Sequence, residues 1–309
     1  MQLPIRAVAG SLIVGVAACL APACGGGGTA ALTRLLEARR LASEMHVEFI
    51  QASEASNRAV MATSEDTSAS AVAEAKRARD LVDRNIAALK PLLESLGYRD
   101  DLRYLDGFTT RFEEYERLDE DILSLAVEGT NVKAQRLSFG PAQQAADAFR
   151  KALEAAASHA TRNKDRVDAL AGNARAAVLE IQVIHAPHIA EPDDTVMTRM
   201  EEQMAACATA ARNALKELQA ALPPNARPQL VAAKDALDRF LAINAEIVSL
   251  SRRNSNVRSL ALLFGRTRVV AAECADQLRA LEQALAKHEF SATRRRPFHS
   301  TQGASVTNR

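Results

Sequence analysis

The side chains best suited to bind a ligand lie in two short polar stretches in the second half of the chain. Arginine guanidinium groups bind carboxylates through paired hydrogen bonds, and asparagine amides can donate and accept beside them. The first stretch carries these two residue types, and the second carries imidazoles and carboxylates. The candidate binding residues are Arg252, Arg253, Asn254, Asn256 and Arg258 in the first stretch, and His185, His188, Asp193 and Asp194 in the second.

Both stretches are predicted to lie at the same end of one helical bundle, because each connects two long helical segments. There they could line a pocket for a small anionic molecule or form a patch for an acidic partner. The alternative is that they are solvated loop residues, in which Arg252 or Arg253 pairs with Asp193 or Asp194. The sequence leaves both interpretations open.

The same residues offer little for metal or cofactor chemistry. Pro187 lies between His185 and His188 and disturbs the helical spacing that two ligands of one metal ion would need. The chain has no Glu-x-x-His pair for a di-iron centre, no Cys-x-x-Cys-His motif for attached haem and no glycine-rich phosphate loop. We therefore predict a non-catalytic protein with no metal site and no cofactor.

Two cysteines, Cys207 and Cys274, lie on apolar stripes of predicted helices. In an exported protein a disulfide between them is chemically permitted. Their Cα atoms would then have to lie within about 7 Å of each other. The alternative is that both are small core residues, and the sequence leaves this choice open.

The N-terminal segment has the pattern of an export signal. Arg6 precedes an apolar run, residues 7–18, that is short for a membrane span. Cys19 and Cys24 follow, and the residues before each resemble the lipobox of a bacterial lipoprotein signal, in which the cysteine is lipidated and becomes the first residue. The lipobox before Cys19 fits better, but Cys24 opens directly onto four glycines, residues 25–28, which suit a flexible tether. We predict lipidation of Cys24, with Cys19 as the alternative.

This interpretation places the protein in the bacterial cell envelope, held at a membrane by its N-terminal lipid and facing the periplasm or the exterior. It divides the N-terminus into a signal peptide, 1–23, and a Gly-rich tether, 24–30. An ordinary cleaved signal peptide and an uncleaved membrane anchor are the alternatives. No second apolar run in the sequence is long enough to span a bilayer.

The elements that position these side chains are predicted to be helices. Aromatic residues make up 4% of the chain, and only 13 glycines and 10 prolines interrupt it, which suits long packed helices better than a β-sandwich. Apolar residues recur at alternating spacings of three and four, as in Leu35, Ala38, Ala42, Met45, Phe49 and Ala52. The net charge is +1 with both signs interspersed, so nothing indicates a nucleic-acid partner.

One structural unit occurs twice. Residues 122–140, ILSLAVEGTNVKAQRLSFG, match residues 247–265, IVSLSRRNSNVRSLALLFG, at eight of 19 positions without a gap. We predict an all-α fold of two tandem antiparallel four-helix bundles, 31–158 and 159–289, followed by a disordered basic tail, 290–309. The repeated stretch would form the corner between the third and fourth helices of each bundle. The last helix of the first bundle either continues into the second bundle, which we prefer, or turns near 158–163.

The repeated stretches resemble part of a known family. A helix ending in Ile122 to Leu125, or Ile247 to Leu250, then a polar turn, then Leu-x-Phe-Gly is similar to the four-helix-bundle sensor domain of methyl-accepting chemotaxis proteins. The resemblance covers most of 31–288. It implies a bundle outside the membrane that reports on small ligands or partner binding proteins. This chain departs from the receptor plan, because it has no second membrane span and no methylation region.

We therefore predict a lipid-anchored, sensor-like binding module for a small ligand, with an anion as one option, or for a membrane signalling partner. The alternative is a structural adaptor that forms homo-oligomers or pairs with a transmembrane receptor without binding a small molecule. The two copies differ most in their polar centres, which are basic in the second copy and not in the first. We therefore expect the functional residues to lie in the basic centre of the second copy.

Overall fold

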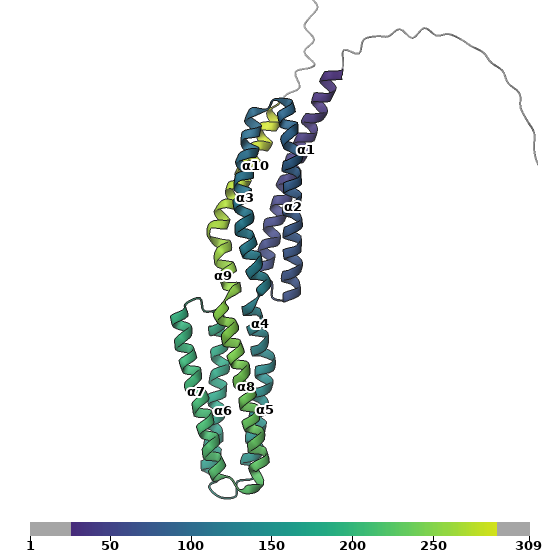
Figure 1. Cartoon of the computed structure of the whole chain (residues 1–309). Coiled ribbons are helices and arrows are strands. Elements are labelled where there is room, and N and C mark those ends of the chain that lie inside the picture. The colour runs from purple at the N-terminus through teal and green to yellow at the C-terminus, as the bar shows by residue number, and fades with distance from the viewer. Residues whose placement is uncertain (1–25, 289–309) are drawn as a thin grey trace, which may run out of the picture.

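The computed structural model describes residues 26–288, which fold entirely into helices and short connections, so the all-α fold is confirmed (Figure 1). Cys19, Cys24, the whole of the predicted signal peptide, 1–23, and the basic tail, 290–309, lie outside the described residues. Helix α1 already begins at Gly26, so most of the predicted tether is helical. None of the helices between residues 26 and 288 is both long and apolar enough to cross a membrane.

The helices form six long rods, two of which are bent. The elements are α1 (Gly26–Val60), α2 (Glu65–Leu96), α3 (Arg99–Glu128), α4 (Thr130–Leu137), η1 (Ser138–Ala142), α5 (Gln143–Ala157), α6 (Lys164–Ala190), α7 (Asp194–Ala221), η2 (Pro224–Ala226), α8 (Arg227–Arg253), α9 (Ser255–Leu262), η3 (Leu263–Thr267) and α10 (Arg268–Lys287). The segments α3 to α5 follow one another as one bent rod, and α8 to α10 as the other. Each bent rod runs through both halves of the molecule (Figure 1).

The two bundles are therefore not consecutive in sequence. Bundle 1 consists of α1, α2, α3 and the α9–α10 rod, whereas bundle 2 consists of α4–α5, α6, α7 and α8. Their cores agree with this division, because α10 residues such as Leu278 pack with α1 to α3, and Phe149 of α5 packs with α6 to α8. The predicted boundaries, 31–158 and 159–289, are wrong, since each half of the chain gives its last helix to the other half.

The reason is that the repeated stretch is a bend and not a corner. Gly129 and Asn254, at equivalent positions, each adopt a left-handed conformation, with φ of 54° and 53°. In each case this is the single residue between two helices, so the chain changes direction slightly and continues. A hairpin back onto the same bundle would need a longer connection.

Local signals explain the other helix ends. Ser64 caps α2 by accepting a hydrogen bond from the Thr67 amide, and Gly97 ends α2 in a left-handed conformation. The preferred continuous helix across residues 158–163 is wrong, because α5 ends at Ala157 and α6 begins at Lys164. Pro187 does not interrupt α6, which continues for three more residues to Ala190, although its missing N–H removes one hydrogen bond of the helix.

Both bent rods carry a π-helical turn at equivalent positions, η1 and η3. Pro141 lies inside η1, where its missing N–H and its ring disturb the regular hydrogen-bond ladder. In η3, Gly265 leaves the helical region with φ −85° and ψ −126°. No helix therefore begins at Pro141, because the rod is already helical from Thr130.

Candidate functional site

The two bent rods cross at the centre of the molecule, where α4 and α9 begin. The first amides of a helix have no partner within it, and neither Gly129 nor Asn254 supplies a side-chain cap. Each helix is instead capped by the other. The Thr130 amide donates to Ser255 Oγ at 2.9 Å, and the Ser255 amide donates to Thr130 Oγ1 at 3.0 Å. We call this set of contacts, with those of the next residue pair, the crossover.

The next residue pair repeats the exchange. The Asn131 amide donates to Asn256 Oδ1, and the Asn256 amide donates to Asn131 Oδ1, both at 3.1 Å. Glu128 and Arg253 form an ion pair one turn earlier. Every one of these contacts joins a residue to its own counterpart 125 positions away. Contacts between equivalent positions are the signature of a two-fold axis, so the internal repeat has produced a pseudo-symmetric crossing.

Asn131 also connects the crossover to the turn between α6 and α7. It is buried, and its Nδ2 donates to Asn254 Oδ1 at 2.7 Å and to the Ile189 carbonyl at 2.5 Å. Asn254 in turn donates to the Glu191 carbonyl at 2.7 Å. A glycine occupies the position equivalent to Asn254, so this second part of the network exists on one side only. Both bundles are thus fastened to each other by buried asparagines.

The predicted anion-binding arginines are mostly occupied by carboxylates of the chain itself. Arg252 binds Glu201 through Nε at 2.6 Å and Nη2 at 3.0 Å, and Asp194 through Nη1 at 3.1 Å. Arg252 holds the pKa of Glu201 below its usual value. Arg258 is exposed, and no ion pair with it is present among the described residues. The pairing of Arg252 with Asp194 is confirmed, and these residues do not form an open anion pocket.

The predicted histidines are buried in bundle 2. His185 Nε2 lies 2.8 Å from Asn244 Oδ1 and its Nδ1 lies 3.0 Å from Ser138 Oγ, while His188 Nε2 lies 2.9 Å from Glu201 Oε1. Because Nε2 of His185 faces an acceptor, it carries the proton, and Nδ1 accepts from Ser138. Residues 26–288 contain no group of three or more His, Cys, Asp or Glu side chains placed to hold a metal ion.

The cysteine pair is not bridged. Cys207 lies in the core of bundle 2 and Cys274 in the core of bundle 1, and both thiols are free. The disulfide interpretation is therefore wrong, because the exchange of the last helices puts the two residues in different bundles. Burial raises the pKa of the Cys274 thiol to about 12, which keeps it protonated and unreactive at neutral pH.

No protein-family model matches this chain, and no curated protein is significantly similar to it. The resemblance to chemoreceptor sensor domains therefore stays a prediction.

Two cavities are candidates for a ligand site. The first, which we call the junction cavity, measures about 400 Å³ and lies beside the crossover. Its walls come from both bundles: the α1–α2 connection and α9 on one side, and α4, η1 and α6 on the other.

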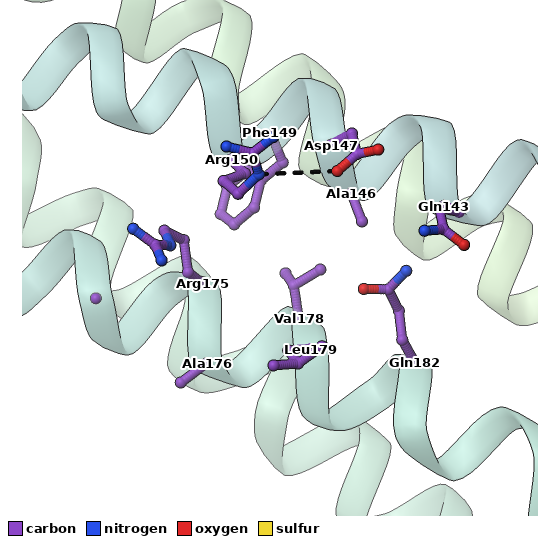
Figure 2. Close-up of a pocket in the computed structure, with 11 residues that line it drawn as sticks. Gln143, Ala146, Asp147, Phe149, Arg150, Arg175, Ala176, Val178, Leu179 and Gln182 are labelled. Atoms are coloured by element: carbon purple, nitrogen blue, oxygen red, sulfur yellow. Dashed lines mark ion pairs between the residues drawn. The ribbon is translucent and has the colours of Figure 1, made fainter.

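The second cavity is a groove of about 390 Å³ between α5 and α6, wholly within bundle 2 (Figure 2). Its floor is formed by Phe149 and Val178, and Gln143 and Gln182 face each other at one end (Figure 2). Its charged side chains are paired, with Arg150 Nε 3.7 Å from Asp147 Oδ1 and Arg175 Nη1 3.6 Å from Glu154 Oε1. The groove touches one bundle only, whereas the junction cavity touches both.

Several residues at this site were not singled out by the sequence analysis. Asn131 and Ser138 belong to the first copy, where the polar centre appeared unremarkable beside the basic one in the second. The identity of Asn131 and Asn256 between the copies was a usable signal. Glu201 and Asn244 carried no signal, because a single polar residue on a long helix is ordinarily solvent-exposed.

Replacing Asn131 with alanine is expected to lower the free energy of unfolding by about 1–3 kcal/mol, because it leaves a buried carbonyl and a buried amide without partners. Urea unfolding would measure the change. Asn256→Ala should cost less, since the Asn256 side chain makes one hydrogen bond, whereas the Asn131 side chain makes three, to Asn256, Asn254 and Ile189. Exposed Asn173 is the control. Equal effects of Asn131→Ala and Asn173→Ala would contradict the role assigned to the crossover.

Acidification is expected to weaken the fold through His185. Burial lowers the pKa of this imidazole below its ordinary value of 6.5, so the unfolded chain takes up the proton at a higher pH than the folded one. The stability contributed by this group is complete well above pH 6.5 and is lost as the pH falls below that value, by at most about 1.4 kcal/mol per pH unit. His185→Gln should show a smaller loss between pH 7.5 and 5.5, whereas His159→Gln, at a half-buried position in the connection between α5 and α6, should match the wild type. If the wild type, His185→Gln and His159→Gln lose the same stability over this pH range, His185 is not the group responsible.

Proposed function

We propose that this protein is a lipid-anchored, extracytoplasmic binding module of the sensor type, without catalytic activity. It binds a small molecule or a membrane signalling partner, and binding in one bundle is transmitted to the other. One observation carries the proposal: both bundles are built on the same two bent rods, which cap each other where they cross. A change of bend at the crossover alters both bundles together, because neither rod can move alone without breaking the shared hydrogen bonds.

The position of the anchor is consistent with this role. The start of α1 and the end of α10 lie at the same end of the molecule, and bundle 2 lies at the opposite end (Figure 1). A lipid at Cys24 would therefore attach bundle 1 to the membrane side and hold bundle 2 away from it. A partner in the membrane would contact bundle 1, and a change that begins at the junction would reach it through the α3 and α9–α10 segments.

A second candidate function is favoured by the surface of α1. Four large apolar side chains on this helix are exposed: Leu32, Leu36, Val47 and Ile50. They lie on the side opposite the core-facing stripe, and their spacing matches one face of a helix. A structural adaptor that pairs α1 with another helical protein, or with a second copy, would cover them.

Hydrogen-exchange mass spectrometry of the full chain in lipid nanodiscs tests the proposal, after a thermal-shift screen of neutral and ionised small molecules. A compound that raises the melting temperature should slow amide exchange at the crossover and in both bundles. In the Ser255→Ala variant, which loses crossover hydrogen bonds without changing a residue that lines the junction cavity, the slowing should no longer extend along both bundles. If no compound binds and the chain retains a membrane protein from envelope extract, the adaptor is correct. If neither occurs, both functions are refuted.

A further inference from the structure

The junction cavity differs from the rest of the surface in having no charged side chain among its fifteen lining residues. One quarter of the chain is charged, so about four charged residues would be expected in a lining of that size. An ion that entered the cavity would lose hydration without gaining a partner of opposite charge. The cavity therefore discriminates against the anions that the neighbouring arginines suggest from sequence.

The cavity instead offers apolar walls and a rim of exposed apolar side chains. Met61, on the α1–α2 connection of bundle 1, is 66% exposed, and Phe139, in η1 of bundle 2, is 65% exposed. A thioether and an aromatic ring at the mouth of one cavity favour a flat aromatic occupant, since both pack well against ring faces and edges. The two side chains belong to different bundles, so an occupant between them contacts both.

Two polar groups set the hydrogen-bonding requirement. Ser138 donates its proton to His185 Nδ1, so its oxygen lone pairs remain available to accept a hydrogen bond. Gln135 lines the same cavity, and no hydrogen bond from its amide is present within residues 26–288, so it can both donate and accept. One amide group on the occupant would satisfy both residues, because its N–H can donate to Ser138 while its carbonyl accepts from Gln135.

The internal repeat shows that these two positions need not be polar. Leu260 and Leu263 occupy the positions equivalent to Gln135 and Ser138, and they pack against the apolar cluster where α1 and α2 meet. The first copy has thus exchanged two packing leucines for hydrogen-bonding groups at the wall of a cavity. Ser138 has an internal partner in buried His185, whereas Gln135 has none within residues 26–288, so Gln135 is the position where a structural role alone would favour leucine.

From these observations we propose that the junction cavity binds an uncharged aromatic molecule that carries one amide-like hydrogen-bonding group. At about 30 Å³ for each water-sized group, the volume of about 400 Å³ accommodates about thirteen non-hydrogen atoms, which corresponds to two fused rings with one substituent. The inference rests on the proposed function and specifies its ligand class. The occupant lies between the bundles and fixes the bend of both rods.

The test uses the full chain in lipid nanodiscs and a matched pair of probes, neutral 2-naphthamide and anionic 2-naphthoate. The chain contains no tryptophan, so naphthalene fluorescence is measured without indole background. Ala186 lines the cavity and is exposed, so Ala186→Leu fills the space without disturbing a core. Ala176→Leu is the matched control on the same helix, outside this cavity and lining the α5–α6 groove. Comparing variants in identical nanodiscs cancels partition of the probe into lipid.

We expect saturable binding of 2-naphthamide, at least tenfold weaker binding of 2-naphthoate, and at least tenfold weaker binding of 2-naphthamide by Ala186→Leu and by Gln135→Leu. Ala176→Leu should stay within twofold of the wild type. Equal affinity for the two probes overturns the neutral class. Loss of binding in Ala176→Leu alone moves the site to the α5–α6 groove and overturns the assignment, as does the absence of saturable binding. Saturable binding at the cavity without altered exchange in both bundles would refute the proposed transmission and leave this site standing.

Discussion

Cleavage of the connection between α5 and α6, residues 158–163, is expected to leave the two halves of the chain bound to each other. A protease site placed there would cut the chain into one half with α1 to α5 and another with α6 to α10. Two consecutive bundles would separate into independently folded monomers. In the observed arrangement, each half lacks a helix that the other half supplies, so the cut protein should elute from gel filtration at the size of the intact one.

The strength of this association follows from the core residues that cross between halves. Bundle 1 receives Val270, Leu278, Leu281 and Leu285 from α10, and all four are fully buried. Bundle 2 receives Phe149 and Leu153 from α5, which are buried equally well. Each such side chain contributes about 1.5–3 kcal/mol when it leaves water. Separation would expose all of them at once and also break the crossover.

The halves expressed alone provide the control. Each should be poorly folded or should form a homodimer that exchanges last helices between copies, since the single-residue bends at Gly129 and Asn254 prevent a hairpin. Mixing the two halves should restore cooperative unfolding near the melting temperature of the intact chain. Recovery of two stable, monomeric halves would show that each last helix can fold back onto its own bundle, contrary to the arrangement described.

The helices and their core-facing sides could be predicted from the spacing of apolar residues in the sequence. The stripe Leu35, Ala38, Ala42, Met45, Phe49 and Ala52 is buried along its whole length, as its spacing predicts. Gly97 ends α2, and Pro223 and Pro224 mark the turn between α7 and α8, each for a reason local to the chain. Such features depend on neighbours a few residues away, which a sequence shows directly.

Whether the chain turns back at Gly129 or continues as a bent helix could not be predicted from the sequence. A glycine or asparagine in a left-handed conformation is compatible with a helix end before a turn and equally with a short bend inside a rod. The choice is made by the hydrogen bonds between Thr130 and Ser255, which are 125 residues apart. The same non-local choice decided the disulfide, because it depended on which helices share a bundle. The anion pocket failed for a different reason, since Glu201 and Asp194 of the neighbouring helix α7 bind Arg252.

A second large effect is expected from Arg79, which neutralises a buried carboxylate in bundle 1. Its guanidinium lies 3.3 Å from Asp119 Oδ2 and 3.0 Å from Glu120 Oε2, and it also donates to the Glu116 carbonyl at 3.1 Å. Asp119 is completely buried, and burial raises the pKa of its carboxyl above the ordinary value, although Arg79 opposes this. Arg79→Met should lower the free energy of unfolding by about 3–5 kcal/mol at pH 7, because the carboxylate stays buried without its cation.

The repeat supplies the variant that separates charge from packing in this prediction. The position equivalent to Asp119 in bundle 2 is Asn244, a neutral side chain of the same shape that bonds His185. Arg79→Met combined with Asp119→Asn should therefore recover most of the loss. The cost of Arg79→Met alone should also shrink towards pH 4, since a raised pKa means that Asp119 takes up its proton as the pH falls and then needs no cation.

Exposed Arg58, paired with Glu74, is the control, and Arg58→Met should cost less than about 1 kcal/mol. An Arg79→Met loss that does not change with pH and is not recovered by Asp119→Asn would assign the effect to packing of the arginine stem and not to its charge.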